Sequence, residues 1–534
     1  MQTNFLPACG KSYISQIESL LTMISTRLIV DSDFVISDLD RRLFGTFVEH
    51  MGRCVYTGIY EPGHPTADER GFRRDVMALS RELGATIVRY PGGNFLSGYN
   101  WEDGVGPKHL RPVRLDLAWY SKETNQFGTN EFMDWCREVG CEPMLAVNLG
   151  TRGPDEARHF LEYCNHPGGT ALSDLRQQHG YEKPHDIKFW CLGNEMDGPW
   201  QIGMKTADEY GRIAKETAKL MRRVDPTVQL AACGSSKHDM PTFGAWEDKV
   251  LDHCFDEVDF ISLHTYFENP HNSTAEFLGN IDQTDLFIKE IVAVADSVAA
   301  RKHSHKRIML SFDEWNVWYK SRTLADKHKP GWPEAPRLIE EVYNHEDALA
   351  VGGALIVMMN NADRVKSACL AQLVNVIGPI MTEPGGPAWR QTIFYPFAQA
   401  SRYARGRVLR PIIQSPTYKA KTFPEIPYLC ASVLHDDASG QTVIFALNRH
   451  LTDEQEISIE LRGLGDQQRL VNASELYHAD MKATNTRAAP NTVVPDRNTA
   501  VQVDGHRLTA RLKPGSWNVI VTTNAKRPEE LFQG

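Results

Sequence analysis

The stretch KFWCLGNEMDGPWQ, residues 188–201, decides how the rest of the chain is interpreted. Its apolar run Phe189–Leu192 predicts a short buried strand, which Gly193 ends just before Asn194 and Glu195. A second stretch, RIMLSFDEWNVW at residues 307–318, repeats this pattern with Glu314. A carboxylate that closes a buried parallel strand usually faces the mouth of an active site. The two stretches therefore predict a pair of carboxylates that share one site.

Around these two stretches, strand and helix patterns alternate. The helical segment at residues 206–226 begins with the capping-box pair Thr206 and Glu209. Other helical patterns lie at residues 72–83, 130–139, 155–164, 246–255, 287–300, 337–351 and 388–404. Near-continuous apolar runs, typical of strands covered on both faces, lie at residues 42–50, 86–93, 143–150, 188–195, 229–236, 260–266, 307–315 and 354–361.

Eight strands that alternate with helices predict an α/β fold of the (β/α)8 TIM-barrel type. The alternative, an open doubly wound sheet, lacks the glycine-rich nucleotide loop that normally accompanies it. After about residue 405 the helical period gives way to alternating apolar and polar residues, as in Leu429, Ala431 and Val433. This pattern predicts a C-terminal antiparallel β-sandwich, jelly-roll-like, which the two short strands at residues 27–40 are expected to join.

The length of 534 residues suits a large barrel with a companion domain. We predict an N-terminal extension (1–26), strands that join the sandwich (27–40), the barrel (41–404), the sandwich (405–524) and a tail (525–534). The tail resembles the remnant of a protease-site tag. A hydrophobic content of 42% and a charged content of 24% are typical of soluble globular proteins.

The net charge of −10 argues against nucleic acid or an anionic membrane as the main partner. No apolar run approaches transmembrane length, and Glu18 interrupts the region where a secretion signal is sought. The ten cysteines are irregularly spaced, without the spacing of a zinc site. We therefore expect reduced thiols in a cytoplasmic protein that uses no metal.

The chemistry is expected where the barrel strands end. Glu195 and Glu314 close the fourth and seventh predicted strands, whose ends face each other across a barrel mouth. Such a pair of carboxylates, each beside tryptophan, indicates glycoside hydrolysis. Asp313 is the competing candidate, but adjacent strand residues point to opposite sides, so only one of Asp313 and Glu314 is expected to face the pocket.

Four motifs resemble one known family. They are GNEMDGPWQ (193–201), DEWNVWY (313–319), RYPGGNF (89–95) and FGTFVEHMGRCVYTGIYEP (44–62). Together they resemble glycoside hydrolase family 51, the α-L-arabinofuranosidases, a branch of the clan of (β/α)8-barrel retaining glycosidases. The resemblance covers about residues 27–522.

The resemblance implies that Glu195 is the general acid/base and Glu314 the nucleophile. A retaining enzyme needs these carboxyls about 5 Å apart, and its acid must keep a proton near neutral pH, through burial or a nearby negative charge. The resemblance also implies substrate-binding or orienting roles for Glu49, Arg89, Asn94, Trp119, Asn194, His264, Tyr266, Trp318 and Gln372. Trp101, Trp200 and Trp315 are predicted to be packing residues.

The expected activity is that of a retaining, exo-acting α-L-arabinofuranosidase that releases terminal arabinose from arabinan, arabinoxylan or their oligosaccharides. Alternatives on the same barrel are a β-xylosidase or an endo-β-glucanase, and a non-catalytic sugar-binding protein is the least favoured. No cofactor is expected. The family suggests a homo-oligomer, often a hexamer.

Overall fold

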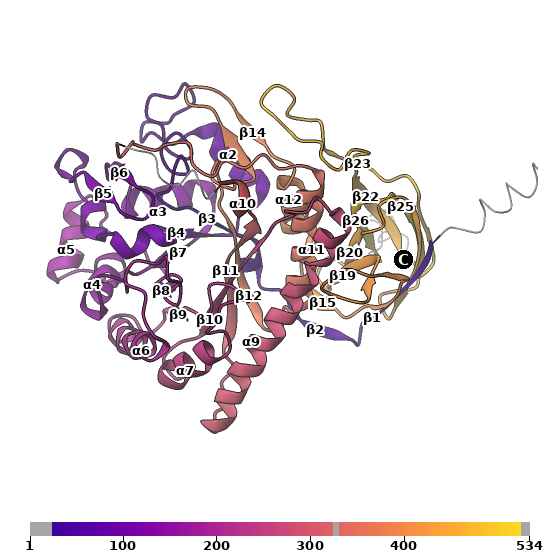
Figure 1. The fold of residues 1–534 in the computed structure, drawn as a ribbon, viewed down its shortest axis with the longest axis horizontal. Helices are drawn as coiled ribbons and strands as arrows, with labels where there is room; N and C mark the ends of the chain where they lie inside the picture. Colours follow the sequence, from indigo (N-terminus) through magenta and orange to yellow (C-terminus); the bar gives the residue numbers. More distant parts are fainter. Residues whose placement is uncertain (1–23, 324–330, 525–534) are drawn as a thin grey trace, which may run out of the picture.

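The computed structural model describes residues 24–323 and 331–524 and contains a closed barrel beside a two-sheet sandwich (Figure 1). The barrel strands are all parallel to their neighbours. In chain order they are β3 (Gly45–Phe47), β4 (Ile87–Tyr90), β7 (Glu142–Ala146), β8 (Phe189–Leu192), β9 (Gln229–Ala232), β10 (Phe260–Phe267), β11 (Met309–Val317) and β12 (Val365–Ala371). The predicted fold, a (β/α)8 barrel with a β-sandwich, is confirmed.

The helices pack outside the barrel and cover the apolar outer faces of its strands (Figure 1). Two predicted helix ends are confirmed, because Thr206 caps α6 through the backbone N–H of Glu209, and Gly84 ends α2 in the left-handed conformation. The helices are α2 (Arg74–Leu83), α3 (Thr129–Val139), α4 (Pro154–Asn165), α5 (Ala171–Gln178), α6 (Ala207–Val224), α7 (Ala245–Cys254), α8 (Thr274–Gly279), α9 (Asp282–Arg301), α10 (Lys320–Thr323), α11 (His345–Asn360) and α12 (Phe394–Tyr403).

The prediction of an eighth strand at residues 354–361 is wrong. These residues belong to α11, and the strand that closes the barrel is β12, which pairs with β11 and β3. Every residue of α11 from His345 to Met359 is buried, because the helix lies between the barrel and the sandwich. A helix that is apolar on all sides has no 3.6-residue period and resembles a buried strand in sequence.

Other boundaries also differ from the predictions. The segment predicted as one strand at residues 42–50 starts with a 3₁₀ turn, Arg41–Phe44, before the short β3. The helix predicted at 337–351 begins only at His345. The helix predicted at 388–404 begins at Phe394, after the hairpin formed by β13 (Ile380–Thr382) and β14 (Ala388–Arg390).

The sandwich consists of a five-stranded sheet, β16-β1-β21-β25-β24, and a seven-stranded sheet, β2-β15-β19-β20-β26-β22-β23. The N-terminal strands β1 and β2 join these sheets, as predicted, and Figure 1 shows them beside strands from the C-terminal part of the chain. Strand β1 begins at Ile24 rather than at Arg27, and it runs parallel to β21, so the sandwich is not wholly antiparallel. The strands are β1 (Ile24–Asp31), β2 (Val35–Asp38), β15 (Arg407–Leu409), β16 (Ile412–Gln414), β19 (Leu429–Asp436), β20 (Gln441–Asn448), β21 (Gln455–Arg462), β22 (Arg469–Leu476), β23 (Pro495–Arg497), β24 (Val501–Asp504), β25 (Arg507–Leu512) and β26 (Ser516–Thr523).

The seven-stranded sheet is buried on both faces where it meets the barrel. On β20, Ile444 and Ala446 belong to the core of the sandwich, whereas Phe445 and Leu447 belong to the core cluster that includes the barrel. Trp517 of β26 lies so close to α11 that a Cβ atom on Gly352 would meet its ring at 2.6 Å. We therefore propose the division near residue 404 as a boundary between two domains that share a large apolar contact.

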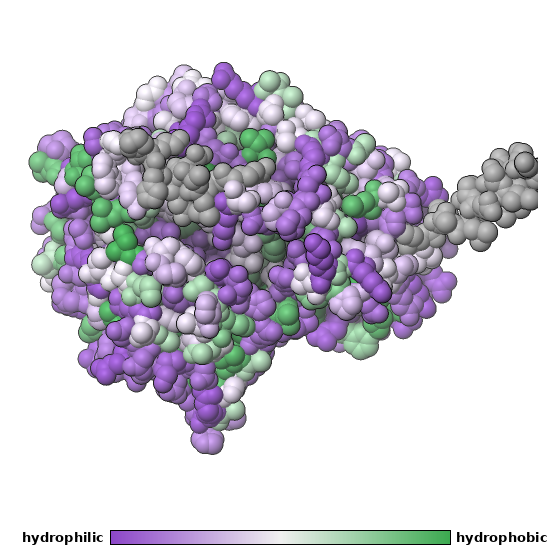
Figure 2. All heavy atoms as spheres, in the orientation of Figure 1, coloured by the Kyte–Doolittle hydropathy of each residue, from purple (hydrophilic) through white to green (hydrophobic). Residues whose placement is uncertain are grey.

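Hydrophilic side chains dominate the face shown in Figure 2, and apolar residues are scattered among them. Within residues 24–323 and 331–524, no helix is long and apolar enough to cross a membrane. The predicted tail at 525–534 and most of the predicted extension at 1–26 lie outside the described residues.

Candidate active site

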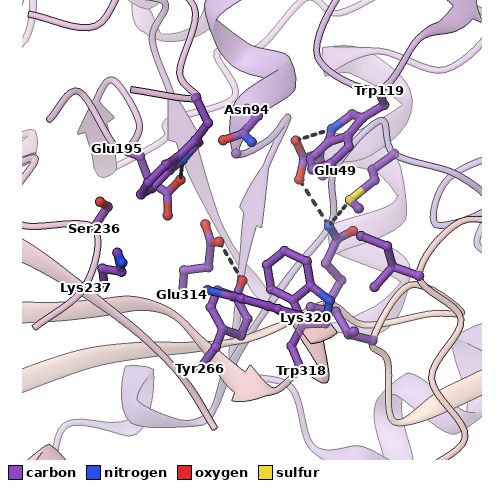
Figure 3. Close-up of a pocket in the computed structure, with 16 residues that line it drawn as sticks. Glu49, Asn94, Trp119, Glu195, Ser236, Lys237, Tyr266, Glu314, Trp318 and Lys320 are labelled. Atoms are coloured by element: carbon purple, nitrogen blue, oxygen red, sulfur yellow. Dashed lines mark hydrogen bonds between the residues drawn. The ribbon is translucent and has the colours of Figure 1, made fainter. Parts of the chain in front are cut away.

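A pocket of about 300 Å³ opens where the barrel strands end (Figure 3). Its walls come from loops that follow β3, β4, β8, β9, β11 and β12, together with the end of β10. The residues predicted for the site that line this pocket are Glu49, Asn94, Trp119, Glu195, Tyr266, Glu314, Trp318 and Gln372. The tertiary fold thus brings together side chains that are far apart in the sequence.

Glu195 reaches the pocket through a tight turn after β8. Gly193 has φ +99°, and Glu195 itself has φ +42°, a conformation that residues other than glycine rarely adopt. Such backbone strain costs on the order of 1–3 kcal/mol and is found mostly at functional sites. The turn directs the carboxylate, which is 8% exposed, toward the indole of Trp200, whose Nε1–H donates a 2.5 Å hydrogen bond to Oε2.

Glu314 lies within β11, on the opposite side of the same space (Figure 3). Its Oε1 accepts a 2.5 Å hydrogen bond from the Tyr266 hydroxyl, and its Oε2 accepts a 3.1 Å bond from Arg89 Nη1. Burial, followed by the charge of Glu314, raises the pKa of Tyr266 well above its ordinary value, so this hydroxyl stays a donor. Carboxylate oxygens of Glu195 and Glu314 lie within 4.8 Å of each other.

Three of the predicted binding residues lie behind the pocket wall. Arg89 Nη2 donates a 2.8 Å bond to Asn194 Oδ1, and the guanidinium also lies 4.7 Å from the centre of the Phe47 ring. His264 Nδ1 lies 3.0 Å from Glu195 Oε1. Arg89 and His264 are therefore placed to hold the carboxylates of Glu314 and Glu195, and Asn194 holds Arg89, while other residues form the surface of the pocket.

Of Asp313 and Glu314 only Glu314 lines the pocket, as predicted, but the argument from strand alternation behind this prediction fails. We expect adjacent strand residues to point to opposite sides, yet Asp313 and Glu314 both contact His264, at 2.9 and 3.7 Å. The pairing of β11 with both neighbouring strands shifts register here, so the simple alternation fails. Asp313 does not line the pocket, because its carboxylate lies deeper in the barrel, beside Cys191.

The charge balance around Glu195 also differs from the prediction. Burial alone would raise the pKa of this carboxyl, but the hydrogen bond and charge of His264, the Trp200 indole and the charge of Lys320 lower it. Burial would in turn lower the pKa of His264, but Glu314, Asp313 and Glu195 outweigh burial and raise it to about 10. The proton that we expected on Glu195 is thus held on the His264 side of their contact.

Glu49 forms a second buried acidic centre at the other end of the pocket. Its Oε1 accepts bonds from the backbone N–H of Phe95 and from Trp119 Nε1, each at 2.9 Å. Its Oε2 accepts a 3.1 Å bond from Gln372 Nε2. Burial raises the pKa of Glu49 to about 8, against the opposing effect of the N–H groups of Phe95 and Trp119.

Trp200 is the clearest residue that the sequence analysis placed wrongly. It lines the pocket and is 42% exposed, whereas Trp101 and Trp315 are buried packing residues, as predicted. Its position in the loop that begins at Glu195 was the signal that pointed to a role in the pocket. The other pocket residues that sequence reasoning missed are Met51, Ser236, Lys237, Lys320, Ile339 and Ile377.

Lys320 places a cation beside both acids. Its Nζ lies 4.9 Å from the centre of the Tyr266 ring and 4.8 Å from that of Trp318. Glu195, His264 and Glu314 also have the spacing of a metal site, among the described residues. Arg89 already supplies positive charge to Glu314, so we interpret the cluster as an ion-pair network; the absence of a metal or cofactor stays a prediction.

Two family models match this chain. The model described as "Alpha-L-arabinofuranosidase 1 domain" matches residues 79–285, which include Glu195. The model described as "Alpha-L-arabinofuranosidase C-terminal domain" matches residues 313–516, which include Glu314 and most of the sandwich.

Similar proteins match over nearly the whole chain. An "intracellular exo-alpha-(1->5)-L-arabinofuranosidase 1" of Bacillus subtilis is 56% identical over 498 residues, covering 93% of this chain and 99% of that protein. An "exo-alpha-(1->6)-L-arabinofuranosidase" of Bifidobacterium longum is 50% identical, covering 93% of this chain and 97% of that protein. The solved structure of AbfB, a family 51 α-L-arabinofuranosidase from Bifidobacterium longum, superposes with a TM-score of 0.90 at 44% identity, covering 94% of this chain and 100% of that one.

Proposed function

Because this chain belongs to glycoside hydrolase family 51, the α-L-arabinofuranosidases, we propose that it removes terminal α-L-arabinofuranosyl residues by a retaining, two-step mechanism. The chain is a glycoside hydrolase that acts on α-L-arabinofuranosides from the non-reducing end. The observation that carries the mechanism is the approach of Glu195 and Glu314 oxygens to within 4.8 Å. Retaining enzymes need about 5 Å, whereas inverting enzymes leave room for a water with about 6.5–9.5 Å.

In the first step, Glu314 attacks the anomeric carbon while Glu195 gives a proton to the departing glycosidic oxygen. Arg89 and Tyr266 hold the two oxygens of Glu314, which fixes the orientation of the nucleophile. In the second step Glu195 takes a proton from water, and the resulting hydroxide displaces Glu314 from the sugar. The product keeps the configuration of the substrate.

The pocket suits a single terminal sugar. Glu49 and Asn94 present hydrogen-bonding groups to it, and Trp119 and Trp318 form aromatic walls (Figure 3). Gln372 also lines the pocket and donates to Glu49. Trp200 lies beside the acid, where the leaving group departs, and we propose that it contacts that group. A pocket of about 300 Å³ with a small number of polar groups is typical of sites that bind one small ligand.

The names of the relatives support a finer proposal. Four relatives that are 51% to 56% identical are named exo-alpha-(1->5)-L-arabinofuranosidases, and each of them is named intracellular. We therefore propose (1→5)-linked arabino-oligosaccharides as substrates, cleaved inside the cell; arabinan and arabinoxylan fragments remain the predicted sources. Another relative is named for (1→6) linkages, so the preference of this enzyme between the two linkages should be measured.

We also propose that the protein forms a homo-oligomer, with a hexamer as the family suggests. Apolar side chains exposed near Trp119 support a protein contact there: Leu110, Val113, Leu115 and Leu117. Light scattering coupled to size-exclusion chromatography gives the mass, and a monomer at micromolar concentration would contradict the proposal.

The test of the function compares hydrolysis of 4-nitrophenyl α-L-arabinofuranoside with that of the matching β-D-xylopyranoside and β-D-glucopyranoside. We expect turnover of the arabinofuranoside, abolished in Glu314→Ala. Added azide should restore turnover in Glu195→Ala and give an α-configured azide product, because azide displaces Glu314 from the face that water normally uses. Preference for the xyloside or glucoside would favour the alternative activities, and a β-configured azide product from Glu195→Ala would contradict the assigned roles.

A further inference from the structure

Asp313 is a buried acid that the two-step mechanism does not use. It lies directly before Glu314 in β11 and is 1% exposed. Its Oδ1 lies 2.9 Å from His264 Nε2, and its Oδ2 lies 3.5 Å from the Cys191 thiol and 3.9 Å from Arg89 Nε. Taking a charge out of water is costly, so a carboxylate with these partners indicates a function for its charge.

His264 connects this acid to the proposed proton donor. Its two ring nitrogens face two carboxylates, with Nε2 at 2.9 Å from Asp313 and Nδ1 at 3.0 Å from Glu195. If Asp313 is ionised, Nε2 must carry a hydrogen to donate to it. Nδ1 then faces Glu195 and shares the second proton with it. Asp313 thus decides which nitrogen exchanges a proton with Glu195.

We propose that Asp313 is a positioning residue, which fixes the tautomer and charge of His264 so that the His264–Glu195 pair holds the proton required by the leaving group. This inference rests on the proposed function of Glu195 and Glu314. In the first step, the proton on His264 Nδ1 passes to the ionised Glu195 and from there to the glycosidic oxygen, which leaves Glu195 ionised to act as the base in the second step. The bond from that oxygen to the anomeric carbon breaks, and the bond to Glu314 forms. An alcohol leaves, and His264 stays bonded to Asp313 through Nε2–H.

The groups around His264 agree with this assignment. The imidazole faces Glu195 from the loop after β8, and Asp313 and Glu314 from β11. Two further cations approach the same carboxylates, Arg89 of β4 at Glu314 and Asp313, and Lys320 of α10 near Glu195 and Glu314. Asp313 contacts His264 on the side away from the pocket, so a substrate can approach Glu195 without disturbing it.

The experiment compares two substrates that differ in their need for a proton donor. A 2,4-dinitrophenyl α-L-arabinofuranoside has a leaving group that departs as an anion, whereas phenyl α-L-arabinofuranoside needs protonation. In Asp313→Asn, the side-chain amide is able to donate a hydrogen bond to Nε2. Nε2 then carries no hydrogen, and His264 adopts the other tautomer, with its hydrogen on Nδ1. We expect kcat/KM to fall about 10- to 100-fold for the phenyl substrate, within the contribution of general acid catalysis, and less than about threefold for the dinitrophenyl substrate.

Glu346→Gln is the matched control, because Glu346 is a buried acid of α11 whose partners Lys482, Thr274 and Asn269 lie away from His264. Any loss in this variant should be the same for both substrates. An equal loss for both substrates in folded Asp313→Asn would overturn the positioning role. Failure of the wild type on both substrates would instead refute the proposed function.

A pH profile gives a second readout that does not depend on the first. Removing the negative charge of Asp313 weakens the binding of the proton that His264 and Glu195 share. The alkaline limb of kcat/KM should therefore move to lower pH in Asp313→Asn. Cys191→Ala removes a thiol that donates to Asp313, so the same limb should move to higher pH. If Asp313→Asn does not fold, Cys191→Ala carries the test by itself, and an unchanged limb in that variant overturns the proposal.

Discussion

Arg89 Nη1 lies 3.1 Å from Glu314 Oε2 in the centre of the barrel, and both side chains are buried. The same guanidinium approaches Asp313 at 3.9 Å, so one cation compensates two adjacent acids. This contact explains why a barrel core tolerates a nucleophilic carboxylate and a second acid beside it.

Replacing Arg89 with methionine should therefore remove the buried guanidinium that pairs with Glu314 and Asp313. We expect the free energy of unfolding to fall by about 3–5 kcal/mol, the typical result of removing one partner of a buried pair. Urea unfolding monitored by tryptophan fluorescence measures it. Arg27→Met, which breaks the surface pair with Glu460, is the control and should change stability little. Equal stability of both variants would contradict the argument.

Trp200→Phe keeps an aromatic ring in the pocket but removes the N–H that donates to Glu195 Oε2. This donor helps to lower the pKa of Glu195, so its loss should raise that pKa. A protonated acid then persists to higher pH, and the alkaline limb of kcat/KM should move upward. Trp101→Phe is the control, because Trp101 stacks on Phe160 and does not line the pocket. An identical profile for Trp200→Phe and the wild type would sink this prediction.

Glu49→Gln tests the buried acid at the inner end of the pocket. In the folded protein the pKa of Glu49 is about 8, against an ordinary value of 4.5, so the unfolded chain releases this proton first. The stability contributed by the protonated form is complete below pH 4.5 and is lost as the pH rises toward 8, by about 1.4 kcal/mol for each pH unit. The glutamine variant lacks this loss, so its stability should decline less steeply over the same range. Denaturant unfolding at several pH values measures the two slopes, and parallel slopes would refute the assignment.

Gly352→Ala tests the contact between the barrel and the sandwich. The added Cβ would lie 2.6 Å from the Trp517 ring, and such overpacking costs about 1–3 kcal/mol, more than the helix propensity that alanine gains. We expect a lower melting temperature with unchanged arabinofuranosidase activity well below it. Gly63→Ala, with nothing within 4 Å of the added carbon, is the control. A variant as stable as the wild type would show that α11 shifts to accept the methyl group.

The sequence by itself determined the class of fold and the two acids. The short, near-continuous apolar runs that end in Glu195 and Glu314 are typical of buried strands, and their spacing along the chain allows intervening helices, so the barrel follows from local patterns. Motifs around these residues identified the family before any contact was known. The position of β1 and β2 before the first barrel strand was enough to assign them to the sandwich.

Only the tertiary structure decided which apolar run was the eighth strand, because α11 is buried on every side and hydrophobicity does not distinguish such a helix from a strand. It also decided that Asp313 points inward. The pairing of β11 is irregular here, so its side chains do not alternate strictly, and the sequence carries no sign of this irregularity. The places of Trp200 and Lys320 in the pocket depend on loops that meet across the barrel mouth. The protonation of His264 likewise depends on its contact with Glu195 from one of these loops. Charges and aromatic faces act over a few ångströms in space, and no pattern along the chain records those distances.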